Sequence, residues 1–230
     1  MGIVAPGFPA DIALELAQIE NISVFVETGT YRGDTARLAA SHFAQVHTIE
    51  LSENFYRDNA EKFSSVPNIV PHLGDSRAVL PHILSKIGSQ PALFWLDGHW
   101  SSGVTAGAGD ECPLLDELAL LGQRDADLIL IDDARFFLSA PPAPHDPACW
   151  PTLVDIVHAL PDQGGRCFMQ IIDDVIFIVP RKLPLVQALI AHARRRPRAW
   201  QAAAPAAPFK GRRPGLARRV GRKLKSLLSP

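Results

Sequence analysis

The stretch Val24-Phe25-Val26-Glu27-Thr28-Gly29-Thr30-Tyr31-Arg32-Gly33-Asp34-Thr35 decides the fold of this chain. Its apolar beginning predicts a buried strand, its glycines predict a turn, and Asp34 or Thr35 can cap the helix that follows. Because glycine lets the backbone approach a ligand closely, this strand, turn and helix are typical of a cofactor cradle.

The spacing of the glycines indicates which ligand this cradle holds. Gly29 and Gly33 enclose three residues, whereas a dinucleotide fingerprint needs Gly-x-Gly-x-x-Gly to bring pyrophosphate onto the helix N-terminus. Pyrophosphate is therefore not the favoured ligand. The acidic Glu27 before the turn suits a ligand with an ammonium group, which S-adenosylmethionine carries on its amino-acid end.

Strand-like apolar runs alternate with helical runs through most of the chain. This alternation predicts an α/β fold with a doubly wound, mostly parallel seven-stranded sheet and helices on both faces. The expected strands are 23–28, 45–50, 69–73, 92–97, 127–132, 167–172 and 175–179. The expected helices are 9–20, 34–43, 52–63, 76–87, 113–123 and 154–160. The last two strands join at Asp173-Asp174, which predicts an antiparallel last strand.

Composition predicts one folded domain over residues 1–193 and a basic, largely disordered tail over 194–230. The chain has 230 residues, of which 47% are hydrophobic, so it can bury one sizeable core. It has no run of about 18 apolar residues and no basic, signal-like start, so we expect a cytoplasmic protein. Its three cysteines are too widely spaced to indicate a zinc knuckle or a disulfide framework.

The charge is divided between these two parts. From residue 194 onward there are 12 Lys and Arg and no Asp or Glu, which leaves 11 basic against 24 acidic residues before it. Leu216, Val220 and Leu224 fall on one helical face among basic residues, which fits an amphipathic helix on an anionic membrane surface. A solvated tail is the alternative. Nucleic acid is a less favoured partner because the tail lacks interleaved aromatic residues.

Further candidate cofactor residues follow the second and third expected strands. Glu50 ends the second strand, where a doubly wound fold places the acid that binds ribose hydroxyls; otherwise it is a solvated carboxylate. The third strand ends in Gly74-Asp75-Ser76, which could flank an adenine, and Ser76 also suits a helix cap.

Three carboxylates follow the fourth and fifth expected strands. If these strands are neighbours, Asp97, Asp132 and Asp133 gather at one edge of the sheet beside the cofactor. Hard oxygen ligands indicate Mg²⁺, with Mn²⁺ or Ca²⁺ as alternatives. The competing interpretation is that Asp97 and Asp132 cap strand ends and Asp133 is solvated.

Taken together, these motifs resemble class I S-adenosylmethionine-dependent methyltransferases, and most closely the metal-dependent catechol-type O-methyltransferases. The resemblance covers roughly residues 20–135. It implies a Rossmann-like methyltransferase fold in which a Gly-x-Tyr-x-Gly turn holds the methionine moiety, an acid ending the second strand holds ribose, and carboxylates after the fourth and fifth strands hold Mg²⁺. By residue match these are Gly29, Tyr31 and Gly33 for the turn, Glu50 for ribose, and Asp97, Asp132 and Asp133 for the metal.

The chain departs from this family in three places. Asp133 stands where the family usually has Asn. The family's lysine general base has no counterpart, since no lysine occurs between Lys86 and Lys182. His99 is the obvious substitute in catalysis beside Asp97, although it could equally be a loop histidine packed on Trp100. A proline-rich insertion over 134–151 lies where substrate would bind.

The resulting functional hypothesis is an S-adenosylmethionine-dependent O-methyltransferase, assisted by a divalent metal, that acts on a hydroxylated small molecule or sugar. Near the site, Glu111 could touch substrate or serve the dipole of the next helix. One alternative is an oxygenase or hydroxylase on the same fold, which resembles the cephalosporin hydroxylase type and uses Fe²⁺ at the carboxylates. The other is a non-catalytic binding protein whose basic tail associates with membranes.

Overall fold

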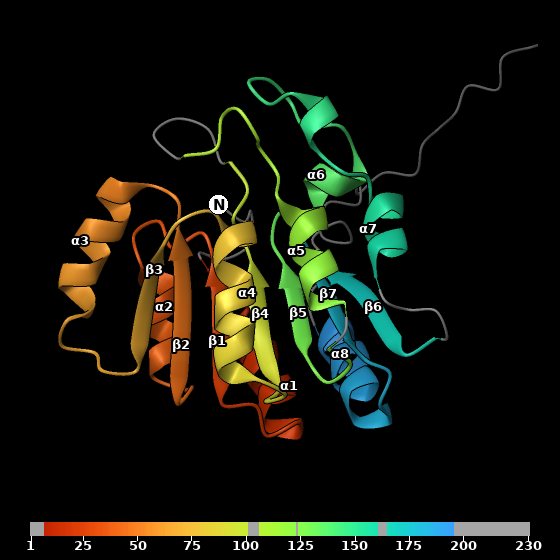
Figure 1. Cartoon of the computed structure of the whole chain (residues 1–230). Helices are drawn as coiled ribbons and strands as arrows, with labels where there is room; N and C mark the ends of the chain where they lie inside the picture. Colours follow the sequence, from red (N-terminus) through yellow and green to blue (C-terminus); the bar gives the residue numbers. More distant parts are fainter. Residues whose placement is uncertain (1–6, 101–105, 123, 161–164, 196–230) are drawn as a thin grey trace, which may run out of the picture. The chain divides into compact units, whose positions relative to one another are not determined.

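The computed structural model describes residues 7–100, 106–122, 124–160 and 165–195. In this part of the chain, seven strands form one sheet in the order β3-β2-β1-β4-β5-β7-β6 (Figure 1). The strands are β1 (Val24–Thr28), β2 (Gln45–Glu50), β3 (Ile69–Leu73), β4 (Ala92–Leu96), β5 (Leu128–Ile131), β6 (Cys167–Ile172) and β7 (Val175–Pro180). β7 runs antiparallel to both of its neighbours, whereas the pairs among β1 to β5 are parallel. The predicted fold class, including the antiparallel last strand, is confirmed.

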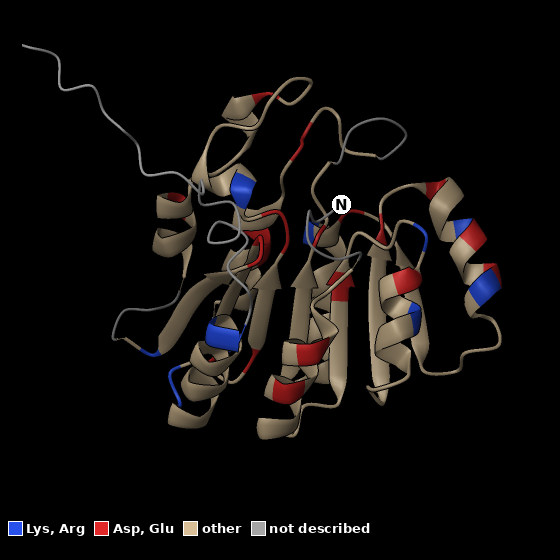
Figure 2. Cartoon of the chain, turned by 180° about the vertical axis from the view of Figure 1, so that it is seen from behind, with Lys and Arg blue, Asp and Glu red and all other residues tan. Residues whose placement is uncertain are grey.

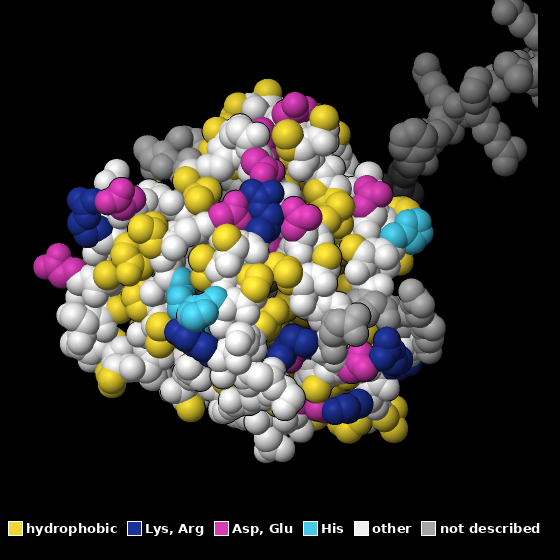
Figure 3. Space-filling model, in the orientation of Figure 1, with side chains coloured by type: hydrophobic (Ala, Val, Ile, Leu, Met, Phe, Trp, Pro, Cys, Tyr) yellow, Lys and Arg dark blue, Asp and Glu magenta, His cyan; other side chains and the backbone are white. Residues whose placement is uncertain are grey.

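Helices cover both faces of the sheet, as the alternating pattern predicts. They are α1 (Ala10–Ile19), α2 (Asp34–Ala40), α3 (Glu53–Phe63), α4 (Ser76–Ile87), α5 (Leu114–Leu121), α6 (Arg135–Leu138), α7 (Leu153–Ala159) and α8 (Leu183–Arg195), with a 3₁₀ turn at Pro147–Cys149. On the face that Figure 3 shows, acidic and basic side chains lie interspersed with apolar ones.

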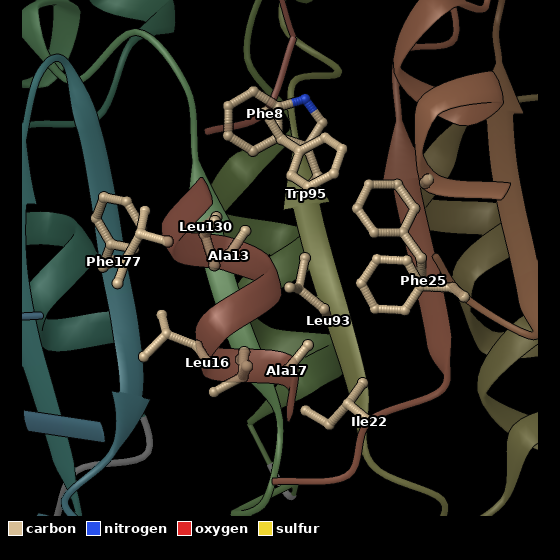
Figure 4. Close-up of a cluster of buried hydrophobic side chains, with 14 of the residues drawn as sticks. Phe8, Ala13, Leu16, Ala17, Ile22, Phe25, Leu93, Trp95, Leu130 and Phe177 are labelled. Atoms are coloured by element: carbon tan, nitrogen blue, oxygen red, sulfur yellow. The ribbon is translucent and has the colours of Figure 1, made fainter. Parts of the chain in front are cut away.

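The core lies on both sides of the sheet because successive strand residues point to opposite faces. Phe25, Leu93 and Trp95 face the layer that contains α1, whose Ala13, Leu16 and Ala17 pack on them (Figure 4). Their chain neighbours, such as Val26, Phe94 and Leu96, belong to a second buried cluster that includes residues of α4, α5 and α7. Because these strands are buried on both faces, their sequences are continuous apolar runs and do not alternate between apolar and polar residues.

The sequence predicted neither α6, the 3₁₀ turn nor α8. The first two are too short to show a helical period. For α8 a signal was present, since its buried residues Leu185, Ala188, Leu189 and His192 follow helical spacing. The tail from residue 196 lies outside the described residues, so the domain boundary at 193/194, the amphipathic helix and the membrane surface stay predictions. Among the helices that the structure describes, none combines the length and the apolar character that crossing a bilayer requires.

Candidate functional site

The strand order changes direction at β1, which has β2 on one side and β4 on the other. In open α/β sheets, ligands bind outside the carboxyl ends of strands at such a switch point. Glu27 belongs to β1, Gly29 follows it, and Asp97 follows β4, so the fold brings these predicted residues to this point. Figure 2 shows Asp and Glu positions at these ends of the central strands.

Gly29 is required by the fold as well as by any ligand. Its φ is +84°, and a Cβ there would lie 2.3 Å from the backbone oxygen of Asp97. Gly33 also has a positive φ, of +81°, and a Cβ there would lie 2.5 Å from the Phe63 ring. Both glycines therefore let the turn pack directly on its neighbours at the carboxyl end of β1.

Glu50 is tied to the same turn. Its buried carboxylate accepts hydrogen bonds from the backbone N–H of Tyr31 at 2.8 Å and of Ser52 at 2.8 Å, one on each oxygen. Burial raises the pKa of Glu50, and these backbone hydrogen bonds oppose the rise. Because each carboxylate oxygen has two lone pairs, both oxygens can still accept a hydroxyl hydrogen bond. The arrangement suits the predicted ribose role.

Asp75 and Ser76 have different roles in the structure from those expected. The cap of α4 is Asp75, whose carboxylate accepts from the Arg77 backbone N–H at 2.9 Å and pairs with its guanidinium at 2.6 Å. Ser76 is the first helical residue and is buried. It hydrogen-bonds the buried Glu117, a residue that the sequence analysis missed, whose pKa burial raises to about 7. The contact of Asp75 and Ser76 with an adenine stays a prediction.

Glu27 is almost fully buried, with 1% of its surface exposed. The Thr48 hydroxyl donates to its carboxyl group at 2.6 Å, and burial raises the pKa of Glu27 to about 8. An ammonium group at the switch point would favour the ionised form of this acid. The proposed contact with the ligand's ammonium group stays a prediction.

Asp97 and Asp132 destabilise each other's charge. Burial raises the pKa of Asp97 well above its usual value, and the charges of Asp132, Asp133 and Glu27 raise it further. Burial and the neighbouring Asp133 raise the pKa of Asp132 as well. The predicted gathering of carboxylates beside the cradle is therefore seen in the structure, and a cation would relieve their repulsion.

Asp133 already has a cationic partner that the sequence analysis did not foresee. The Arg135 guanidinium lies 2.6 Å from its carboxylate and also pairs with Asp174, in the turn between β6 and β7. The backbone of Asp133 has a φ of +55°, a conformation that Asp and Asn adopt more readily than most residues. This conformation explains why either residue suits the position where the family usually has Asn.

Within the described ranges, no group of three or more His, Cys, Asp and Glu is arranged to hold a metal ion. The predicted three-carboxylate metal centre is therefore not seen as a preformed set. Asp97 and Asp132 keep suitable oxygen donors, while one oxygen of Asp133 is taken by Arg135.

His99 is enclosed beside the carboxylates. Its Nε2 lies 3.5 Å from oxygens of both Asp97 and Asp133, and its side chain is 4% exposed. Burial lowers the pKa of His99 to about 4, although Asp133 opposes this shift. Neither ring nitrogen has a hydrogen-bond partner. The ring packs on Trp150, 5.1 Å between centroids, whereas the alternative expected Trp100, which packs on His145. An enclosed, packed histidine still describes this geometry better than an exposed base does.

The proline-rich insertion folds back over this site, and we call residues 134–151 the strap. Glu111 fastens it, accepting hydrogen bonds from Trp150 Nε1 at 2.7 Å, from the Asp146 backbone N–H at 3.0 Å, and pairing with His145 Nδ1 at 3.1 Å. The sequence predicts two alternative roles for Glu111, contact with substrate or interaction with the dipole of the next helix. Neither role predicts that Glu111 binds three residues of the strap. Sequence spacing gives no signal for it, because the contacts join residues more than 30 positions apart.

The sheet order, the helices on both faces and the cradle at the switch point together define the class I methyltransferase fold. A solved structure confirms this class: the O-methyltransferase TomG from Streptomyces achromogenes, which is involved in tomaymycin synthesis and was solved in complex with SAM. It superposes with a TM-score of 0.51 at 14% identity, over 78% of this chain and 82% of that chain. The resemblance predicted from the motifs is thus confirmed at the level of the fold.

Two further solved structures are similar. Cofactor-bound Rv0187 from MTB matches with a TM-score of 0.46 at 14% identity, over 75% of this chain and 78% of that one. An rRNA methylase from Streptococcus thermophilus matches with a TM-score of 0.43 at 13% identity, over 75% and 93%. No family model and no curated protein matches the chain.

Proposed function

We propose that this chain is a cytoplasmic S-adenosylmethionine-dependent O-methyltransferase that acts on a hydroxylated small molecule or sugar. One observation carries the proposal. At the switch point, the Gly29 turn, the half-satisfied carboxylate of Glu50 and a group of mutually repelling acids lie at the carboxyl ends of neighbouring strands. These are the parts needed for a ligand with a ribose at one end and positive charge at the other.

The chain's own residues have separable tasks in this reaction. When bound, S-adenosylmethionine supplies a methyl group on a sulfonium for in-line displacement by the acceptor oxygen. Glu50 accepts hydrogen bonds from the ribose hydroxyls, and Asp97 with Glu27 stabilises the positive end. The strap covers the acceptor side and excludes water. Such positioning supplies most of the rate enhancement in an in-line transfer.

Calorimetric titration with S-adenosylmethionine tests the cofactor assignment. Glu50→Ala should weaken binding about 10- to 100-fold, which corresponds to losing hydrogen bonds to a charged group. Glu50→Gln, which keeps the side-chain volume, should weaken binding less. The control is Glu53→Ala, an exposed acid at the start of α3, which should bind like the wild type. Equal affinity in all four proteins would contradict the assignment.

The activity itself is tested with a panel of phenols, catechols and sugars. Formation of S-adenosylhomocysteine on any of them supports methyl transfer. Oxygen consumption that requires Fe²⁺, without S-adenosylhomocysteine, would favour the hydroxylase alternative. Tight cofactor binding without either reaction would favour a binding protein.

We further propose that Asp97 and Asp132 hold a divalent cation, Mg²⁺ in the first place, with Mn²⁺, Ca²⁺ or Fe²⁺ as alternatives. Mg²⁺ in proteins is commonly held by one or two carboxylates, with water or substrate oxygens completing the shell. The raised pKa values of both acids support the proposal, because a cation would relieve the repulsion. Such an ion would lower the pKa of an acceptor hydroxyl.

Thermal unfolding with added metal tests the proposed cation site without a methyl acceptor. Mg²⁺ or Mn²⁺ should raise the melting temperature of the wild type by mass action, and EDTA should reverse the rise. The double variant Asp97→Asn, Asp132→Asn should show no metal-dependent shift. A wild type whose melting temperature ignores both ions and EDTA would contradict a metal at these residues.

A further inference from the structure

Proton removal from an acceptor hydroxyl lacks an obvious base in this chain. The family's lysine has no counterpart, and His99 is buried with both ring nitrogens unpartnered. Its closest polar contacts, to two carboxylates, are 3.5 Å long. A second histidine, His145 on the strap, is also largely enclosed, with 7% of its side chain exposed, but unlike His99 it has a hydrogen-bond partner.

His145 is paired with a fixed carboxylate. Its Nδ1 lies 3.1 Å from Oε2 of Glu111, and that oxygen also accepts from Trp150 Nε1 at 2.7 Å. The other oxygen of Glu111 accepts from the Asp146 backbone N–H at 3.0 Å. Although burial raises the pKa of Glu111, these hydrogen bonds outweigh it and lower the pKa. The carboxylate therefore stays ionised at neutral pH.

A carboxylate at Nδ1 determines which ring nitrogen can accept a proton. It holds the hydrogen on Nδ1, so the lone pair of the neutral ring is on Nε2. This is the arrangement in which an aspartate orients the histidine base of serine hydrolases. The Nε2 of His145 is not among the buried, unpartnered atoms of the described residues, in contrast to both nitrogens of His99.

The His145 ring lies in an aromatic wall that continues to the carboxylates. It packs against Trp100 at 5.2 Å, Phe136 at 5.4 Å and Trp150 at 5.4 Å between ring centroids. Trp150 in turn packs on His99, which lies between Asp97 and Asp133. The Glu111–His145 pair is therefore linked to the carboxylates of Asp97 and Asp133 by contacts through two residues, Trp150 and His99.

We propose that Glu111 and His145 form the acid–base dyad of this site, with His145 as the base for the acceptor hydroxyl and Glu111 as its positioning residue. The proposal rests on the proposed methyl transfer. As the acceptor's O–CH₃ bond forms and the S–CH₃ bond breaks, the hydroxyl proton passes to His145 Nε2 and then to solvent. S-adenosylhomocysteine leaves neutral at sulfur, and the ionised Glu111 stabilises the transient imidazolium.

Reaction of the full chain with diethyl pyrocarbonate tests the dyad, because this reagent acylates unprotonated, accessible imidazole nitrogens. Peptide mass spectrometry gives the rate at each histidine. We expect faster modification at His145 than at His99, because Glu111 leaves the lone pair of His145 on Nε2, whereas both nitrogens of His99 are buried. Glu111→Gln should slow the reaction at His145 by about tenfold, because a carboxylate hydrogen-bonded to one ring nitrogen makes the other more basic; at metal-binding histidines such partners have effects of that size.

Trp150→Phe is the matched control, because it removes another hydrogen bond of Glu111 while keeping an aromatic ring. The His145 rate should be unchanged in it, which separates the charge effect from a loosened strap. An unreactive His145, or equal slowing in both variants, would overturn the dyad. Calorimetry with S-adenosylmethionine on the same proteins separates the two proposals: wild type that binds the cofactor but has an unreactive His145 refutes the dyad alone.

Discussion

At the scale of single residues, Gly29 carries the tightest constraint at the site. Its φ of +84° and the 2.3 Å separation between a built Cβ and the Asp97 backbone oxygen exclude any side chain without movement of β1 or β4. The sequence predicts glycine here because a ligand approaches the backbone closely. The structure adds a second reason, since the ends of β1 and β4 also approach each other closely at this residue.

Replacement by alanine separates these effects. Gly165 also has a positive φ, of +69°, but a Cβ there meets nothing within 4 Å. We expect Gly165→Ala to cost about 1 kcal/mol through its backbone conformation alone. Gly29→Ala should cost about 2 kcal/mol more, because an overpacked site must shift. Urea unfolding of both variants gives the comparison, and equal midpoints would contradict the reported contact.

The residues that sequence could identify are those whose role depends on their position in a strand. Glu27, Gly29, Glu50 and Asp97 belong to strand ends or the turns that follow, and the order of strands alone brings them together. The partners of Asp133 could not be identified in this way. Its pairing with Arg135 and Asp174 depends on how a loop meets a distant hairpin.

At the scale of elements, that pairing fastens the chain after β5 to the turn between β6 and β7. The Ala134 backbone N–H donates to the Asp174 carbonyl at 2.8 Å, and the Arg135 backbone N–H donates to the Asp174 carboxylate at 2.9 Å. The Arg135 side chain then joins Asp174 to the buried Asp133. The strap thus begins from a rigid anchor.

Removing the positive charge of Arg135 should lower the free energy of unfolding. Arg135→Met leaves two carboxylates facing each other, and breaking such a buried pair typically costs about 3–5 kcal/mol. Arg57→Met is the control, since its pair with Glu53 on α3 is exposed and should contribute little. Denaturant unfolding at neutral pH compares the two variants. An Arg135→Met protein as stable as Arg57→Met would show that the anchor does not contribute to stability.

Regular elements were predicted to within a few residues because their burial imposes a clear period. β2 and β3, for example, occupy the predicted residues 45–50 and 69–73. The strap was not predictable in this way. Its conformation depends on one distant carboxylate, Glu111, and on aromatic packing that has no period along the sequence.

At the scale of the whole molecule, buried acids make stability depend on pH. Burial raises the pKa of Glu27 to about 8 and that of Glu117 to about 7, and it raises that of Asp97 and Asp132 as well. Between pH 6.5 and 8 the folded chain therefore binds more protons than the unfolded chain. By linkage, its free energy of unfolding falls as pH rises through this window.

The buried histidines do not reverse this sign above pH 6.5. Burial lowers the pKa of His47 and His99 from 6.5 to about 4, so they begin to weaken the folded state as the pH falls toward 6.5, but above that pH the raised acids outweigh them. Urea unfolding of the ligand-free protein should give a higher midpoint at pH 6.5 than at pH 8. Glu27→Gln should reduce the difference, by about 1.4 kcal/mol per pH unit at most. A midpoint that rises with pH would contradict the burial of neutral acids.

A crystal structure of the full chain with S-adenosylmethionine tests most directly whether the cofactor binds at the carboxyl ends of β1 and β4. The ribose hydroxyls should lie within hydrogen-bond distance of Glu50, and the amino-acid end should lie against the Gly29 turn beside Asp97. A ligand bound elsewhere, or no ligand at these strand ends at a saturating ligand concentration, would contradict the proposed cofactor site.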